Sequence, residues 1–292
     1  MKDLLRKTGR NFLVCAMLAA FLLAAGCACR LNMGAKGISS SLPKDATWQE
    51  SPRLTELFHG LRAQFGLEGV FVLYDREKNV LIGYNEARAN TRYQPASTFK
   101  ILNALIAFET GVVKDQNMVL PYGGGSQPVP AWEKDMTIQE AMAVSNVPLF
   151  QGIARRIGLE RMREYVRKAH YGNAEIGQVV DNFWLKGPLA ISALEQISFI
   201  DKLNRGDLPF SARSMELVRI IMPREENRLP GVVFYKTGRA TSTQPGIGWV
   251  VGWVRYDGRD YPFAFNMDIN KAEDADMRLP LTWQALQALG LF

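Results

Sequence analysis

Strand-like segments lie towards both ends of this 292-residue chain, and helix-like segments separate them. Near the start, Gly69–Tyr74 is a short apolar run, and a turn over residues 75–79 joins it to Val80–Tyr84. Beyond residue 230, further runs are rich in Val, Trp, Tyr and Phe, at Gly231–Thr237, Ile247–Tyr256 and Asp260–Ile269. Asp257-Gly258 predicts a hairpin turn between the last two. We therefore expect one antiparallel sheet that is assembled from both ends of the chain.

Helices are expected between and around these strands. Ser51-Pro52 opens a helix with an apolar stripe, and Ser97 or Thr98 begins a strongly apolar helix that ends at Gly111. Two later helix starts have the spacing of a capping box, at Thr137/Glu140 and Ser192/Glu195. The chain closes on an amphipathic helix over Leu281–Leu289.

Together these elements predict a mixed α/β (α+β) fold of two lobes. An α/β lobe of about residues 51–90 and 226–292 holds the sheet and its flanking helices. A mainly helical lobe of about residues 91–225 is inserted into it. The cleft between two such lobes is a natural place for a site.

Composition excludes a disordered tail, a collagen-like fibre and a polytopic membrane protein. With 47% apolar and 22% charged residues, the chain is long enough to bury a sizeable core. The net charge is +6, but residues 1–26 supply half of it through Lys2, Arg6, Lys7 and Arg10 against Asp3. The remainder shows no basic stripe with aromatic platforms, so no nucleic-acid partner is expected.

The first residues have the order of a secretory leader. Basic residues up to Arg10 precede the apolar run Phe12–Ala25, and small residues follow, which predicts a signal peptide over residues 1–26 and export to the periplasm. Residues 27–50 are polar and are interpreted as a tether before a domain at 51–292. Ala24-Ala25-Gly26-Cys27 resembles a bacterial lipobox, with Ala24 where leucine is usual. Lipid anchoring at Cys27 and ordinary cleavage near Ala28 or Ala35 are therefore alternatives.

Cysteine and histidine are too few for several kinds of chemistry. Cys15, Cys27 and Cys29 all fall in the leader region, so the domain has no internal disulfide, cysteine nucleophile or cysteine-ligated metal. The histidines are His59 and His170, which we expect on helix surfaces. A Ser-His-Asp triad or a metal site is therefore not expected, and chemistry must depend on serine, lysine or carboxylates.

Three short motifs supply such groups in order along the chain. Ser97-Thr98-Phe99-Lys100 places a hydroxyl and an amine on one face at a helix start, where lysine deprotonated by burial could activate serine. Ser145-Asn146-Val147 follows a helix, and Lys236-Thr237-Gly238 ends a strand. Each motif is weak alone, but the series resembles the active-site set of penicillin-recognising serine enzymes.

Further segments narrow this resemblance to the class D, or oxacillinase-type, serine β-lactamases. The segments are Pro95–Lys100, Tyr171-Gly172-Asn173, Phe183-Trp184-Leu185 and Trp249-Val250-Val251-Gly252-Trp253. The resemblance extends from about Trp48 to Phe292. Class A enzymes fit less well, because Asn146 stands where they have aspartate and no Glu-x-x-Leu-Asn segment is present.

The resemblance implies a role for each catalytic position. Ser97 would be the nucleophile that opens the lactam ring and carries the acyl group. Lys100 would be carboxylated on its amine by carbon dioxide and would serve as general base, with no other cofactor. Ser145 and Lys236 would relay a proton to the departing lactam nitrogen.

The resemblance also implies the surroundings of these groups. Backbone N–H groups of Ser97 and Arg239 would form the oxyanion hole. Trp184 would hydrogen-bond the carbamate, and Val147 and Leu185 would control the access of water to it. The β-lactam would be held by Thr237, Gly238 and Arg278, whose guanidinium pairs with its carboxylate. Without the resemblance, Trp184 reads as core, Tyr171-Gly172-Asn173 as an architectural turn and Arg278 as a helix cap. A charged Arg239 departs from the family pattern and could alter which substrates fit.

Three alternative functions share parts of this pattern. A penicillin-binding D,D-peptidase has the same motifs, but Trp184, together with the apolar Val147 and Leu185, favours a β-lactam hydrolase. A β-lactam sensor domain should follow several transmembrane helices, and this chain shows one short apolar run. A non-catalytic lipoprotein would not need Ser97, Lys100, Ser145 and Lys236 together. We expect β-lactam antibiotics as partners, and nothing in the sequence indicates the oligomeric state.

Overall fold

The computed structural model describes residues 46–225 and 231–291, all within one compact unit. The predicted signal peptide, its Cys27 and most of the tether lie outside the described residues. The end of the predicted tether is corrected: Thr47–Glu50 form strand β1, which pairs in parallel with β3 (Val80–Tyr84). The folded domain therefore begins before residue 51.

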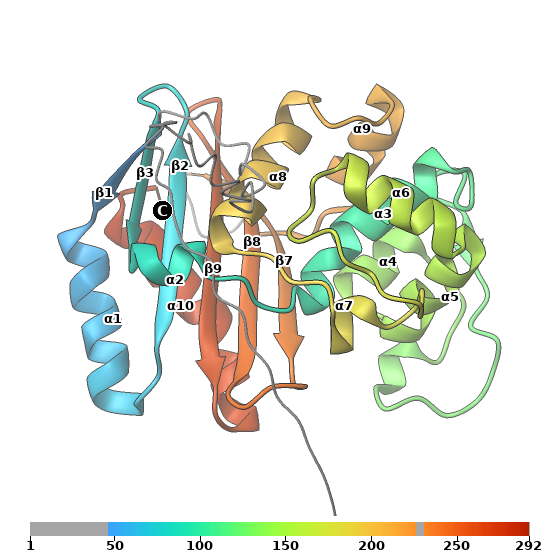
Figure 1. Ribbon diagram of the computed structural model, residues 1–292, viewed down its shortest axis with the longest axis horizontal. Coiled ribbons are helices and arrows are strands. Elements are labelled where there is room, and N and C mark those ends of the chain that lie inside the picture. Colours follow the sequence, from blue (N-terminus) through green and yellow to red (C-terminus); the bar gives the residue numbers. More distant parts are fainter. Residues whose placement is uncertain (1–45, 226–230, 292) are drawn as a thin grey trace, which may run out of the picture. The chain divides into compact units, whose positions relative to one another are not determined.

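A seven-stranded sheet forms the centre of the α/β lobe, with the order β1-β3-β2-β9-β8-β7-β6 (Figure 1). The strands not yet placed are β2 (Gly69–Asp75), β6 (Arg224–Glu225), β7 (Val232–Ala240), β8 (Gly246–Tyr256) and β9 (Arg259–Ile269). All pairs other than β1 with β3 are antiparallel. The early strand β2 pairs with the late strand β9, which confirms a sheet built from both ends of the chain. Strand β7 runs to Ala240, beyond the predicted end at Thr237.

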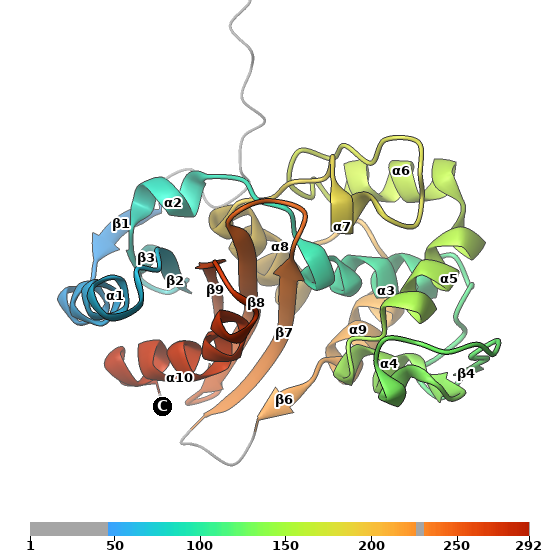
Figure 2. The ribbon, with the colours of Figure 1, turned by 90° about the horizontal axis from the view of Figure 1, so that it is seen from below.

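Helices cover both faces of this sheet (Figure 2). On one face, α1 (Pro52–Phe65) and α10 (Arg278–Ala288) pack together over an apolar core that includes Phe71, Val250 and Phe265. On the other face lie α2 (Glu86–Asn90) and α8 (Ala193–Arg205). The sheet is therefore buried on both sides, which explains why β2 is apolar at nearly every position.

The helical lobe surrounds the apolar helix α3 (Lys100–Glu109), which is buried from Lys100 to Phe108. Its neighbours are α4 (Ile138–Ala143), α5 (Val147–Ile157), α6 (Leu159–Lys168), α7 (Phe183–Lys186) and α9 (Ala212–Ile221). Short elements complete the fold, namely the strand pair β4 (Val119–Leu120) and β5 (Met136–Thr137) and the 3-10 helices η1 (Ala96–Phe99), η2 (Pro130–Trp132) and η3 (Ala272–Met277). Both predicted capping boxes are present, at Thr137 and Ser192.

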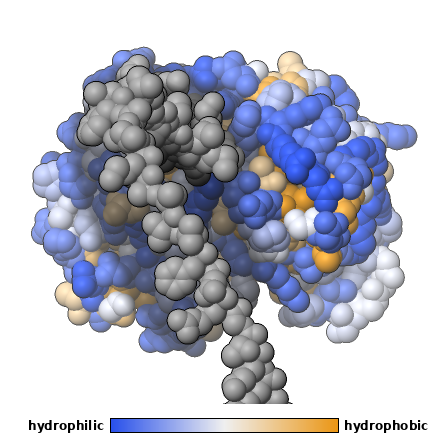
Figure 3. Space-filling model, viewed as in Figure 1, coloured by the Kyte–Doolittle hydropathy of each residue, from blue (hydrophilic) through white to orange (hydrophobic). Residues whose placement is uncertain are grey.

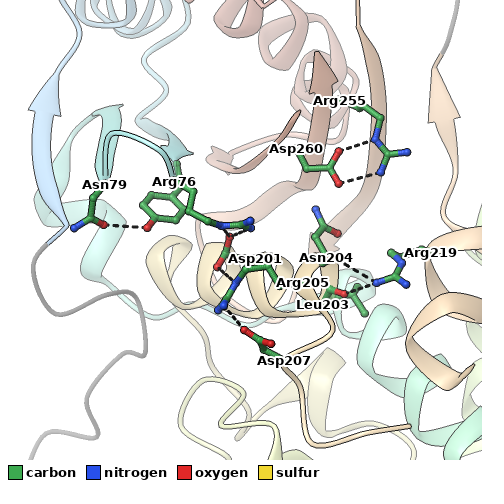
Figure 4. Close-up of polar contacts among 11 residues, drawn as sticks. Arg76, Asn79, Asp201, Leu203, Asn204, Arg205, Asp207, Arg219, Arg255 and Asp260 are labelled. Carbon is green, nitrogen blue, oxygen red and sulfur yellow. Dashed lines mark hydrogen bonds and ion pairs between the residues drawn. The ribbon is translucent and has the colours of Figure 1, made fainter. Parts of the chain in front are cut away.

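Ion pairs fix the end of α8 against the sheet (Figure 4). The buried carboxylate of Asp201 accepts hydrogen bonds from Arg76 Nε at 2.9 Å and from Arg205 Nε at 3.1 Å. Arg76 lies in the turn between β2 and β3, so this contact joins the helix to an early part of the sheet. An unpaired buried carboxylate would be costly, and two guanidinium partners offset that cost.

The surface seen in Figure 3 is mainly hydrophilic, with apolar residues gathered on the side that the helical lobe occupies in Figure 1. Within residues 46–225 and 231–291, no helix is both long and apolar enough to cross a membrane. His59 is exposed on α1 as predicted, whereas His170 is exposed in the turn after α6 and not on a helix.

Candidate active site

The first motif lies at the junction of η1 and α3. Ser97 belongs to the 3-10 turn, Lys100 is the first residue of α3, and residues three apart on such a turn nearly eclipse. Lys100 Nζ therefore donates to Ser97 Oγ at 2.6 Å. The serine is half-buried, whereas Lys100 is 0% exposed. The helical start predicted at Ser97 or Thr98 is confirmed to within two residues.

The second motif is the turn between α4 and α5. Asn146 caps α5 by accepting from Leu149 N at 2.9 Å, so the backbone reverses at Ser145. Ser145 adopts a left-handed conformation with φ of 53°, which costs a non-glycine residue about 1 kcal/mol or more. In this conformation, Ser145 Oγ accepts from Lys100 Nζ at 3.3 Å.

The third motif lies on β7, in the part of the strand that extends past β6. Lys236 is buried, and its Nζ donates to Ser145 Oγ at 3.0 Å and to the carbonyl of Thr237 at 3.1 Å. The four predicted catalytic side chains thus form one continuous hydrogen-bonded chain, in the order Ser97, Lys100, Ser145 and Lys236.

Burial sets the protonation of both amines. Burial, together with the positive charge of Lys236, lowers the pKa of Lys100 well below its ordinary value of 10.5. Burial and the charge of Arg278 lower the pKa of Lys236 to about 7. Both shifts favour the neutral amine over the ammonium form, and only a neutral amine can accept a proton.

Aromatic rings form the wall behind Lys100. Phe99 stacks on Trp184 with ring centroids 5.3 Å apart, and the ring of Phe150 lies 5.6 Å from Lys100 Nζ. Trp184 is fully buried, yet its indole Nε1 has no hydrogen-bond partner in the structure. Val147, the first residue of α5, and Leu185, in α7, are both half-buried. An unpaired buried donor is costly, so the indole N–H of Trp184 is available to donate a hydrogen bond to an acceptor.

The remaining predicted residues line the end of β7. Arg278 is half-buried at the start of α10, and it donates from Nη1 to the carbonyl of Gly238 at 2.6 Å and from Nε to the carbonyl of Ala275 at 2.5 Å. A side chain at Gly238 would bring a Cβ to 2.9 Å from the carbonyl of Pro95, so only glycine lets β7 approach η1 this closely. Thr237 is half-buried and Arg239 is exposed.

Sequence reasoning missed two contributors to the site. Phe150 contacts Lys100 from α5, and Gln196 supports η1 from α8 through a bond from its Nε2 to Thr98 Oγ1 at 2.8 Å. The hydroxyl of Tyr171 donates to Gln196 Oε1 at 3.3 Å, and burial raises the pKa of this tyrosine. Only the position of Phe150, three residues after Val147 on one helix face, could have indicated a role.

No metal ligand set accompanies these groups. Across the residues that the structure describes, no three histidine, cysteine, aspartate or glutamate side chains gather in a way that could bind a metal ion. The side chains of the hydrogen-bonded chain are hydroxyls and amines.

A buried lysine beside a serine at a helix start, facing a second serine and an edge-strand lysine, defines a penicillin-recognising serine enzyme. Residues 69–285 match the family model described as penicillin binding protein transpeptidase domain. Beta-lactamase OXA-5 of Pseudomonas aeruginosa is 41% identical over 77% of this chain and 85% of its own length. Beta-lactamase OXA-48 of Klebsiella pneumoniae is 40% identical, over 82% and 89%. The chain belongs to the class D β-lactamases.

A solved structure agrees with this assignment. The class D β-lactamase YbXI from Nostoc superimposes with a TM-score of 0.77 at 41% identity, and the match covers 82% of this chain and 99% of that one. The expected fold of penicillin-recognising serine enzymes is therefore confirmed. The chain is a serine β-lactamase, a hydrolase that acts on β-lactams.

Proposed function

We propose that Ser97 opens the β-lactam ring as a nucleophile and that Lys100 removes its proton. The observation that carries this proposal is the 2.6 Å contact between Ser97 Oγ and the fully buried amine of Lys100. Attack forms the bond from Ser97 Oγ to the lactam carbonyl carbon and breaks the bond from that carbon to the ring nitrogen. The product is an acyl-enzyme, which water must then hydrolyse.

The oxyanion that develops during attack is bound by two backbone N–H groups. Ser97 lies in the first turn of η1, where N–H groups have no partner within the helix. Arg239 lies on β7 beyond the segment that β6 covers, so alternate N–H groups there are free of strand pairing on that side. Donors fixed in this way stabilise charge that appears only in the transition state.

Ser145 and Lys236 return the proton to the departing ring nitrogen. Ser145 Oγ accepts from both lysines, so it bridges Lys100 to Lys236. Lys236, with a pKa of about 7, can donate and recover a proton near neutral pH. Arg278 binds the carboxylate of the antibiotic, alongside Thr237 and Gly238.

Deacylation needs a base for water, and Lys100 meets the requirements for carboxylation. Its neutral amine can form an N–C bond with carbon dioxide and lose a proton, which leaves a carboxylate on the side chain. The unpaired indole N–H of Trp184 fits such a carboxylate, because it is a buried donor without an acceptor. The half-buried Val147 and Leu185 limit the access of water to this carboxylate in our proposal. The carboxylate has two acceptor oxygens and no N–H or O–H to donate, so it can accept a hydrogen bond and a proton from that water.

Substitution of the nucleophile tests the acyl-enzyme. We expect Ser97→Ala to fold normally and to lose hydrolysis by at least about a thousandfold, because the covalent route is gone. Intact-mass measurement with a slowly released penicillin should give one adduct on the wild type, mapped to Ser97, and none on Ser97→Ala. An adduct on another residue contradicts the assignment.

Removal of carbon dioxide tests the base. Turnover should fall in depleted buffer and recover on addition of bicarbonate, and it should also fall at mildly acidic pH as the carbamate is lost. Trp184→Phe should need more bicarbonate for half-maximal recovery, because the donor to the carboxylate is removed. If depletion changes nothing and labelled bicarbonate gives no carbamate carbon signal, Lys100 acts as a plain amine.

We also propose that residues 1–26 direct export to the periplasm and that Cys27 becomes a lipid anchor. The order of basic, apolar and small residues supports export, and Ala24-Ala25-Gly26-Cys27 supports lipidation. In a Gram-negative host, the wild type should sediment with membranes and Cys27→Ser should be released to the periplasm. Equal solubility of the two forms would indicate an ordinary cleaved signal.

A further inference from the structure

Arg239 is a cation without a counterpart at the mouth of the site. Its side chain is exposed, and no described residue forms a hydrogen bond or ion pair with it. It directly follows Lys236-Thr237-Gly238, so its backbone is part of the proposed oxyanion hole while its side chain is free to contact substrate.

The side chain of Arg239 lies on the same face of the sheet as Arg278. Arg239 pairs directly with Gly248 of β8, and directly opposed residues point to one face. The space that a side chain at Gly248 would fill is taken by Arg278, whose Cδ would be 2.8 Å from such a Cβ. Thr237 shares this face, because it stands two residues before Arg239 on the strand.

The charges at this place do not balance. Burial and the nearby charge of Arg239 both lower the pKa of Arg278, because the two guanidinium groups repel each other electrostatically. Asp276 raises the pKa of Arg278 and so opposes this effect, whereas no described carboxylate forms an ion pair with Arg239. Two N–H positions of Arg278 are already used by backbone carbonyls, whereas the guanidinium of Arg239 is entirely available.

We infer that Arg239 is a specificity-determining residue that binds a second anionic group on the substrate, beside the ring carboxylate bound by Arg278. The enzyme accordingly favours β-lactams whose acyl side chain carries a carboxylate. This inference rests on the proposed roles of Arg278 and of the Arg239 backbone.

A pair of substrates that differ by one carboxylate tests this inference. Benzylpenicillin and its α-carboxy derivative carbenicillin share the ring system and the phenyl group. In Arg239→Gln, the ratio of kcat/KM for carbenicillin to kcat/KM for benzylpenicillin should fall about three- to fivefold, the size expected for an exposed ion pair. The same ratio should fall with rising ionic strength in the wild type and hardly at all in the variant.

Two further variants serve as controls. Arg239→Lys keeps the charge and should retain most of the wild-type ratio. Arg259→Gln removes an equally exposed arginine from the start of β9, where it pairs with Glu77 at the opposite end of β8 from Gly248. It changes the net charge of the protein by the same amount and should leave the ratio unchanged.

The outcomes separate this inference from the proposed function. An equal loss of kcat/KM for both substrates in Arg239→Gln leaves the ratio unchanged and overturns the inference, because Arg239 then does not bind a second anionic group. A fall of similar size in Arg259→Gln also overturns it, since overall charge would explain the effect. A wild type that is acylated by neither penicillin on Ser97 would instead contradict the proposed function.

Discussion

Lys236 holds a positive charge in a place where burial opposes one. Burial and Arg278 lower the pKa of Lys236 from 10.5 to about 7. Between these values the unfolded chain binds the proton and the folded protein does not, so the free energy of unfolding rises with pH from about 7 to about 10.5. Below about pH 7 the folded protein bears the full cost of the buried cation. The catalytic role proposed for Lys236 would therefore come at the expense of stability.

This cost gives a testable pH dependence. In buffer depleted of carbon dioxide, we expect Lys236→Gln to have a higher free energy of unfolding than the wild type at about pH 6. Between about pH 7 and 10, the free energy of unfolding of the variant should rise less than that of the wild type. Hydrolysis should be lost in the same variant. Denaturant unfolding across this pH range measures the effect, with the exposed Lys186→Gln as a control that keeps the wild-type slope. A wild-type slope in Lys236→Gln would mean that Lys236 stays protonated throughout.

The segment between α6 and α8 carries Trp184, and one glycine fixes its path. Gly172 has φ of 56°, and a Cβ there would lie 2.1 Å from the carbonyl oxygen of Ala190. Asn173 completes the contact by donating its backbone N–H to that carbonyl at 2.9 Å. The predicted architectural role of Tyr171-Gly172-Asn173 agrees with these contacts. Displacement here would move α7, and with it the indole of Trp184 that stacks on Phe99.

We expect Gly172→Ala to lower the free energy of unfolding by more than about 3 kcal/mol, because the clash with backbone adds to the cost of the left-handed conformation. Gly177→Ala is the matched control: it has φ of 60° in the same segment, but its nearest contact would be 3.3 Å from Pro188 Cδ. That variant should lose only about 1 kcal/mol. Thermal unfolding of both measures the difference, and equal losses would contradict a specific contact at Gly172.

Elements with a local signal were predictable from the sequence, and elements without one were not. The capping boxes at Thr137 and Ser192 and the Asp257-Gly258 turn are coded within a few residues. Strands β1 and β6 were missed, because two to four residues show no alternation and gain their partners far along the chain. Motif spacing predicted the four side chains that the structure brings into one hydrogen-bonded chain. Phe150 and Gln196 were missed, because only packing of α5 and α8 brings them near η1.

At the scale of the molecule, the site depends on β7 being the strand next to the helical lobe. Its pairing with β6 stops at Phe234, so residues 236–240 pair with β8 on one edge while η1 contacts β7 near the other. At the edge of the sheet away from β7 lie β3 and β1, which come from the start of the domain. The strand that carries Lys236 therefore belongs to a sheet to which both ends of the domain contribute.

This arrangement predicts what removal of β1 would do. Trp48 of β1 covers Gly83, where a Cβ would lie 2.5 Å from Trp48 Cη2, so the strand contributes buried aromatic area as well as pairing. Protein beginning at residue 46 should keep the thermal stability of the mature enzyme, whereas protein beginning at residue 51 should unfold about 4–8 °C lower, the shift expected for about 2 kcal/mol in a domain of this size. Hydrolysis at 25 °C should be the same in both, because four strands separate β1 from β7. Equal melting temperatures would show that the domain begins at residue 51 after all, and a selective loss of activity would mean that β1 reaches the site through the sheet.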